Sequence, residues 1–194
     1  MPQSLPQFNP SQYSQLGMDM SDDALVTFGA PVGPGEVSFH DTGFMPVNQL
    51  TLGNLTLPSP SGLGGLFISY SGDGVQNFSA NGAPTSANYT DLHYQLIGYT
   101  GDATFSHAAD GTPTLSGVST EVVLAQGDLI AGHLAFGATG NISGEVDTTM
   151  QVGGVNVGDL DISVQHSASD IGHTATGGLT LSAGALHATY VPMG

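Results

Sequence analysis

The 194-residue chain contains no lysine and no arginine, although it carries 16 aspartates and glutamates. Proteins bind nucleic acid mainly by neutralising phosphates with lysine and arginine, and anionic membrane surfaces attract the same side chains. We therefore expect neither nucleic acid nor an anionic membrane surface among the partners. The absence also excludes lysine Schiff-base chemistry and an arginine clamp on a carboxylate or phosphate.

Cysteine and long apolar runs are missing as well. Without cysteine the chain can form neither disulfides nor thiolate metal sites, and without a long apolar run no transmembrane helix is expected. Only 8% of the residues are charged, against about 25% in an average protein. Burial and backbone hydrogen bonds must therefore hold the fold together. Since this composition would be unusual in the cytosol, we expect an extracellular or cell-surface location.

Glycine is abundant, with 29 residues interspersed among threonine, serine, valine and leucine. This mixture is typical of short strands joined by tight turns. Strand and turn signals recur at short intervals from about residue 88 onward, which favours an antiparallel arrangement. We therefore expect an all-β, mostly antiparallel sandwich or barrel over residues 22–194, preceded by an extended arm over residues 1–21.

Residues 141–152 give the clearest strand signal. Ile142, Val146 and Met150 share one parity, while Glu145 and Asp147 share the other. Successive side chains of a strand point to opposite faces, so this segment predicts one buried face and one wet face that carries both acids. Because the chain has no lysine, such a strand cannot form a Lys–Glu ladder, and we expect shape and register to specify its neighbours.

Glycine-rich motifs predict turns at several points along the chain. Turns are expected at residues 41–43, 71–74, 110–111 and 153–154, and a polar loop at residues 167–178.

Prolines recur at every fourth position near the start of the chain and favour an extended conformation there. The segment is either a flexible tail or an arm that docks on a neighbouring subunit. A purely solvated tail would not need apolar anchors. The candidate anchors, including those in the next strand, are Leu5, Phe8, Tyr13, Leu16, Leu25 and Phe28.

The seven histidines show no i, i+2 or i, i+4 spacing that would place two imidazoles on one element. The best metal candidates are His166, Asp170 and His173 around the polar loop, and the i, i+2 pair Asp159 and Asp161. Exposed, solvated side chains are the favoured explanation of both patterns. We therefore expect no cofactor, and Ca²⁺ is the ion that the turn acids would suit.

No catalytic motif is present, and the G-x-S-x-G nucleophile pattern is missing. A Ser/His/Asp hydrolase site would have to be assembled from distant residues. We therefore expect a protein that is not an enzyme.

Residues 137–192 contain the runs GATGNISGEV, LDISVQHSASD and LHATYVP. In these runs the chain resembles exported Gly/Thr-rich bacterial surface or matrix proteins, including those with a C-terminal Pro-Glu-Pro sorting tail, although it carries no such tail. The resemblance implies a location at the bacterial surface and identifies no functional residues.

Two functions fit these observations. The first is a non-enzymatic extracellular structural protein that self-assembles into a fibre, filament or matrix through strand edges and the N-terminal arm, because lysine, a common guard of exposed edges, is absent. The second is a secreted β-barrel or sandwich binding module for a small ligand, a glycan or a metal.

Overall fold

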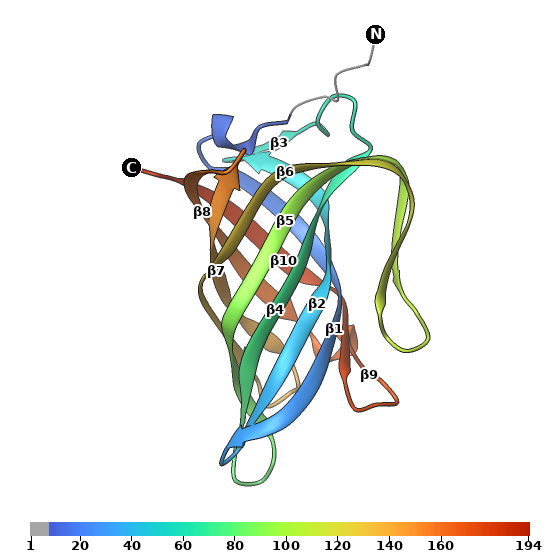
Figure 1. The fold of residues 1–194 in the computed structure, drawn as a ribbon, viewed down its shortest axis with the longest axis vertical. Helices are drawn as coiled ribbons and strands as arrows, with labels where there is room; N and C mark the ends of the chain where they lie inside the picture. The colour runs from blue at the N-terminus through green and yellow to red at the C-terminus, as the bar shows by residue number, and fades with distance from the viewer. Residues whose placement is uncertain (1–7) are drawn as a thin grey trace.

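The structure, a computed structural model, describes residues 8–194 and consists of one antiparallel sheet of ten strands (Figure 1). The strands are β1 (Leu16–Gly33), β2 (Glu36–Leu52), β3 (Leu55–Leu57), β4 (Gly65–Phe78), β5 (Pro84–His107), β6 (Pro113–Phe136), β7 (Ile142–Val152), β8 (Val155–His166), β9 (Ile171–His173) and β10 (Leu179–Pro192). Helical structure within residues 8–194 is limited to 3₁₀ turns at Pro10–Gln12 and Ala168–Asp170, and no helix there could cross a membrane.

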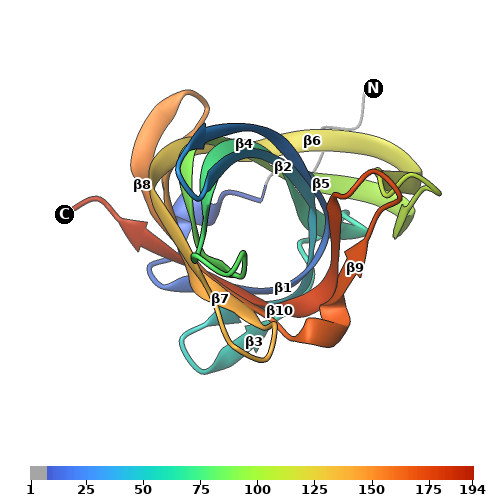
Figure 2. The same ribbon diagram turned by 90° about the horizontal axis from the view of Figure 1, so that it is seen from below.

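The strands follow one another as an up-and-down meander that closes into a ring. Strand β1 pairs with β2 on one side and with β10 on the other. Strands β3 and β9 are short additions paired with β2 and β10, so the other eight strands form the ring (Figure 2). The all-β, antiparallel prediction is confirmed, and the sheet is a closed barrel rather than a sandwich.

Side chains fill the barrel interior. On β7, Ile142, Val146 and Met150 are buried while Glu145 is exposed, which confirms the predicted alternation. Eight strands enclose a width that side chains just fill, so this interior is a core. Much of the core comes from large aliphatic side chains: Leu16, Met18, Met20, Met45, Leu50, Ile68, Leu96, Met150, Leu160 and Ile162.

Two predicted turns are wrong, because residues 41–43 lie inside β2 and residues 71–74 inside β4. The glycines there serve close packing instead. A Cβ on Gly43 would lie 2.6 Å from the Asp23 carbonyl oxygen, and a Cβ on Gly74 would overlap the Phe39 ring. Glycine within a strand often marks such a close approach. The turns predicted at residues 110–111 and 153–154 are present.

Histidine–aspartate pairs connect neighbouring strands on the outer wall. Each pair lies directly opposite in the ladder: His40–Asp73 at 2.9 Å, His93–Asp128 at 2.9 Å and His187–Asp19 at 2.6 Å. Cross-strand pairs of this kind help to set register. None of these three pairs involves residues 142–152, so the prediction that shape and register specify the neighbours of that strand stays a prediction. In the strands that carry these pairs, histidine supplies the polar partner that lysine supplies in other proteins.

The hairpin formed by β5 and β6 continues beyond the ring. Its outer part, residues 101–118, here called the strap, lies outside the barrel wall on the side of β1 and β9 (Figures 1 and 2). The register of the hairpin shifts at Gly101, and Gly101 and Gly117 have φ values of +98° and +78°. Because L side chains rarely adopt such values, glycine at both positions allows the hairpin to bend.

An aromatic cluster fastens the strap to the wall. The Phe105 ring centroid lies 5.4 Å from that of Phe67 and 6.0 Å from that of Phe44, and Tyr99 lies 5.8 Å from Phe67. The strand neighbours of Phe67 on β4 point into the barrel, so Phe67 points outward. Its side chain is nevertheless only 1% exposed. The strap and its stem therefore form a second small core outside the barrel.

Candidate functional site

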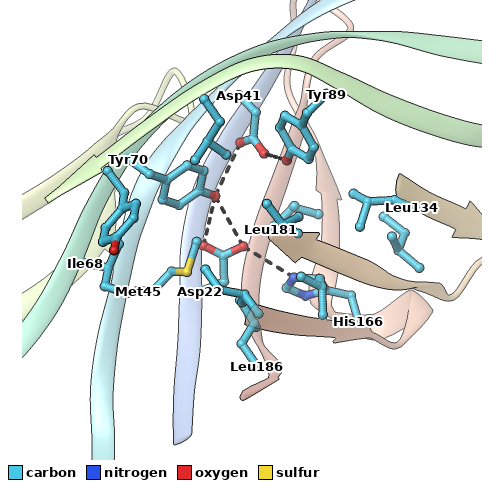
Figure 3. Close-up of a pocket in the computed structure, with 16 residues that line it drawn as sticks. Asp22, Asp41, Met45, Ile68, Tyr70, Tyr89, Leu134, His166, Leu181 and Leu186 are labelled. Carbon is cyan, nitrogen blue, oxygen red and sulfur yellow. Dashed lines mark hydrogen bonds and ion pairs between the residues drawn. The ribbon is translucent and has the colours of Figure 1, made fainter. Parts of the chain in front are cut away.

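A buried polar cluster lies inside the barrel (Figure 3). Asp22 on β1, Asp41 on β2, Tyr70 on β4, Tyr89 on β5 and His166 on β8 point toward one another. Both aspartates are 3% exposed. Buried acids need partners, and this chain has neither lysine nor arginine to supply them.

Hydrogen bonds join four members of the cluster. Tyr89 donates to Asp41 Oδ2, and the Tyr70 hydroxyl oxygen lies 3.2 Å from Asp22 Oδ1 and 3.4 Å from Asp41 Oδ1. A phenol has one proton, so Tyr70 can donate to only one of the two acids at a time. The other contact becomes a hydrogen bond only if that acid carries a proton and donates to the Tyr70 oxygen.

The electrostatics of the cluster favour such a protonated acid. Burial raises the pKa of Asp41 to about 7; the negative charge of Asp22 contributes to the rise, and hydrogen bonds from Tyr89 and Tyr70 oppose it. Burial also raises the pKa of Asp22, while His166 opposes that rise. The phenol pKa values of Tyr70 and Tyr89 are raised well above their usual value, first by burial and then by the carboxylates. The tyrosines therefore remain donors, and Asp41 is the acid that can hold a proton near neutral pH.

The His166 side chain is completely buried and lies next to Asp22. Its Nε2 atom is 3.4 Å from Asp22 Oδ2. The distance allows charge attraction, but the contact does not have hydrogen-bond geometry, and neither ring nitrogen has a hydrogen-bond partner within the described chain. Beside the ring is a cavity of about 30 Å³. A space of that size accommodates about one or two water molecules and is too small for an organic ligand.

The predicted metal candidates do not come together. His166 points into the barrel, whereas His173 is exposed on β9. Asp170 caps a 3₁₀ turn, and Asp159 and Asp161 lie at alternating wall positions of β8 that point away from the core. Among residues 8–194, no three histidine, aspartate or glutamate side chains form a group that could hold a metal ion.

The predicted assembly anchors pack mainly on their own barrel where the structure describes them. The rings of Phe8 and Tyr13 stack at 5.6 Å and pack against the core, as does Phe28. Leu16 is fully buried in β1, which begins inside the predicted 1–21 arm. Leu25 lies beneath the strap tip, and Leu5 lies outside the described residues.

A larger space lies outside the barrel, between the strap and the wall. This groove has a volume of about 620 Å³, within the usual range for small-molecule sites. It is lined by residues of the wall and of β6 in and next to the strap: Phe44, Phe67, Ser69, Gln95, Ile97 and residues 115–121. The lining combines apolar side chains with hydroxyls and an amide, and its one charged residue is Glu121.

Neither site was predicted from the sequence, although His166 of the polar cluster was singled out there as a metal candidate. A signal for Asp22 did exist, because it shares parity with Met18, Met20, Ala24 and Val26 on an otherwise apolar face. No local pattern in the sequence predicts the groove. It exists because a hairpin bends back over strands that are distant in the sequence.

Comparisons with known proteins identify no relative. No protein-family model matches the chain, and neither the curated proteins nor the solved structures include a significant match.

Proposed function

We propose that the protein is a non-enzymatic binding module that holds a small, uncharged, hydroxyl-rich ligand, such as a glycan, in the groove beneath the strap. The supporting observation is the groove volume of about 620 Å³. The interior cavities at the polar cluster measure only about 30 Å³ each. Composition supports an extracellular or cell-surface location for such a module.

The chemistry of the lining favours an uncharged ligand. An anionic ligand would meet no lysine or arginine and would approach a chain with a formal charge of −16. Gln95, Glu121 and the strap hydroxyls can exchange hydrogen bonds with sugar hydroxyls, and Phe44 and Leu115 provide apolar surface for the sugar C–H groups. The groove is open to solvent, so an oligosaccharide can enter it.

The proposal can be tested by titrating the full-length, isotope-labelled protein with maltohexaose, cellohexaose and chitohexaose and following backbone NMR shifts. We expect at least one sugar to shift the signals of residues 115–121. Gln95→Ala should weaken that binding by about tenfold, the effect of losing one polar contact. The matched control is Gln165→Ala, an exposed glutamine on β8, three strands away.

Absence of any shift with all three sugars would refute the proposal. Equal weakening by Gln165→Ala would also refute the assignment of binding to the groove.

Self-assembly is a second candidate, and one observation favours it. Within the described chain, residues 113–121 of β6 pair only with β5, because pairing with β7 begins at Gln126. This free edge carries no lysine, so a strand from another copy could add to it. The eight ring strands offer no comparable edge along most of their length.

Light scattering and electron microscopy across pH and Ca²⁺ concentration test self-assembly. We expect Val118→Lys, a charge placed on the free edge, to reduce assembly, and Val155→Lys, at an exposed turn, to leave it unchanged. Removal of residues 1–7 tests the contribution of the arm. A strict monomer under all conditions would rule out this candidate.

A further inference from the structure

The strap is attached to the barrel at its tip as well as at its stem. His107 ends β5 within the strap, and its Nε2 lies 3.0 Å from the carbonyl oxygen of Ala24 on β1. Its Nδ1 lies 3.7 Å from Asp23 Oδ1, and both of these side chains are 18% exposed. The turn at Gly111 packs against Leu25 of β1. The tip therefore rests on β1 through a half-buried polar contact.

We propose that His107 is a proton-controlled latch that holds the strap closed over the ligand groove. The inference rests on the proposed function, because it concerns access to the same groove. With both ring nitrogens protonated, His107 donates to the Ala24 carbonyl oxygen and also presents an N–H to the Asp23 carboxylate. When the ring is neutral, Nε2 keeps the proton that is donated to Ala24. Nδ1 then has no proton, and its lone pair faces the Asp23 carboxylate. The first state closes the latch, and the second loosens it.

The surroundings of His107 support this role. Asp23 and Asp22 are the acids that β1 places near it, and Asp22 points into the barrel cluster. Burial raises the pKa of Asp23, a positive charge on His107 opposes the rise, and Asp22 adds to it. Asp110 in the tip and His173 on β9 are both exposed. A positive charge on His107 lowers the pKa of both acids, and Asp23 is the one that lies within 4 Å of the ring.

The strap can move without breaking the barrel. Its strands pair with each other through residues 104–107 and 113–116, and they pair with no ring strand in the part of the chain that is described. Gly101 and Gly117 provide the bend. Loosening the tip would leave the packing of Phe105 on Phe44 and Phe67 as the remaining contact with the wall, and rotation about the stem past that contact would widen the groove. Because the doubly protonated ring closes the latch, we expect closure in mild acid and opening in mild base.

Spin labelling provides a direct test without ligand. The chain has no cysteine, so Ala109→Cys places a single label at the exposed strap tip. We expect the mobile fraction of the label to rise about fivefold between about pH 5 and pH 8, the difference between a charged and a neutral hydrogen bond. His107→Gln, which keeps an N–H for Ala24 but cannot gain charge, should give a flat profile. Asp23→Asn should also flatten it.

The matched control is His133→Gln, an exposed histidine that bonds to Asn88 on the barrel wall. It should retain the wild-type profile. A flat profile in the wild-type label, or a wild-type profile in both His107→Gln and Asp23→Asn, would overturn the latch. Because these measurements contain no sugar, a failed sugar titration would refute the binding proposal and leave the latch result standing.

Discussion

Asp41 illustrates how this chain compensates for having no lysine or arginine. A buried carboxylate usually finds a cationic partner, and here its neighbours are two tyrosine hydroxyls and a second acid. Burial raises the pKa of Asp41 to about 7, so the acid keeps a proton instead of a charge. At the scale of single residues, protons take the place of fixed positive charges inside the barrel.

We predict that Asp41 makes the barrel less stable as the pH rises. Its pKa is about 7 in the folded state against 3.8 ordinarily, so the folded state binds the proton more tightly. The contribution is complete below pH ~4 and is lost as the pH rises through ~7. Between pH ~5 and pH ~8 the wild type should lose about 3 kcal/mol from this group.

Asp41→Asn, which mimics the protonated acid, should remove most of that loss. Urea unfolding at the two pH values measures the difference. Asp91→Asn, an exposed change on β5, should keep the wild-type slope. If Asp41→Asn also keeps the wild-type slope, the proton is held elsewhere in the cluster.

We also predict that the cavity beside His166 holds ordered water. The ring has no hydrogen-bond partner within residues 8–194, and the adjoining space measures about 30 Å³. Buried polar groups rarely remain unpaired, so about one or two waters should link the ring to the cluster. A high-resolution crystal structure would show them, and water–amide cross-relaxation by NMR would confirm long residence. A dry cavity in both experiments would contradict this prediction.

At the scale of elements, the strap depends on two glycines that allow a hairpin to bend. Gly117 has a φ of +78°, and a Cβ there would overlap the carbonyl oxygen of Asp102. The bend brings Phe105 onto Phe44 and Phe67, which covers apolar surface that would otherwise face solvent. The strap, the outer aromatic cluster and the groove therefore form together.

We predict that Gly117→Val displaces the strap. Backbone strain and the overlap should together cost about 2–3 kcal/mol and speed amide exchange in residues 104–118. The matched control is Gly82→Val, where φ is +81° but no atom lies within 4 Å of the added Cβ. Because Gly82→Val has the positive φ without the close contact, it measures the free-energy cost of the backbone angle alone. Equal effects on stability and exchange would show that the close contact at Gly117 is unimportant.

At the scale of the whole molecule, a closed ring coexists with a formal charge of −16. Closing the sheet pairs the first and last long strands, β1 and β10, so each strand has a neighbour on both sides within the ring, while residues 113–121 of β6 pair only with β5. Uncompensated negative charge opposes any compact state through self-repulsion. Stability of the barrel should therefore respond to ionic strength.

We predict that raising NaCl from about 20 mM to about 500 mM at pH ~7.5 increases the melting temperature by several degrees, because salt screens the repulsion. Thermal unfolding followed by circular dichroism measures the shift. Sucrose at equal osmolality separates screening from preferential exclusion. An equal gain in sucrose would assign the effect to exclusion instead.

Local patterns in the sequence were sufficient to predict the fold class. The alternation around Val146 and Met150 predicted β7, and the turn at residues 110–111 was visible because its residues favour turns. The glycines at positions 43 and 74 misled the prediction, since glycine permits both a turn and a close approach of neighbouring strands. Only the neighbour across the sheet distinguishes these two uses.

The sequence by itself determined that the chain is all-β and antiparallel, and that no lysine or arginine is available to pair with its acids. Tertiary structure decided that the sheet closes into a ring, that Asp22 meets His166, and that the strap bends over Phe67 to form a groove. These outcomes depend on contacts between strands far apart in the chain. Such contacts follow from register and packing summed over the whole sheet, and no short segment contains that information.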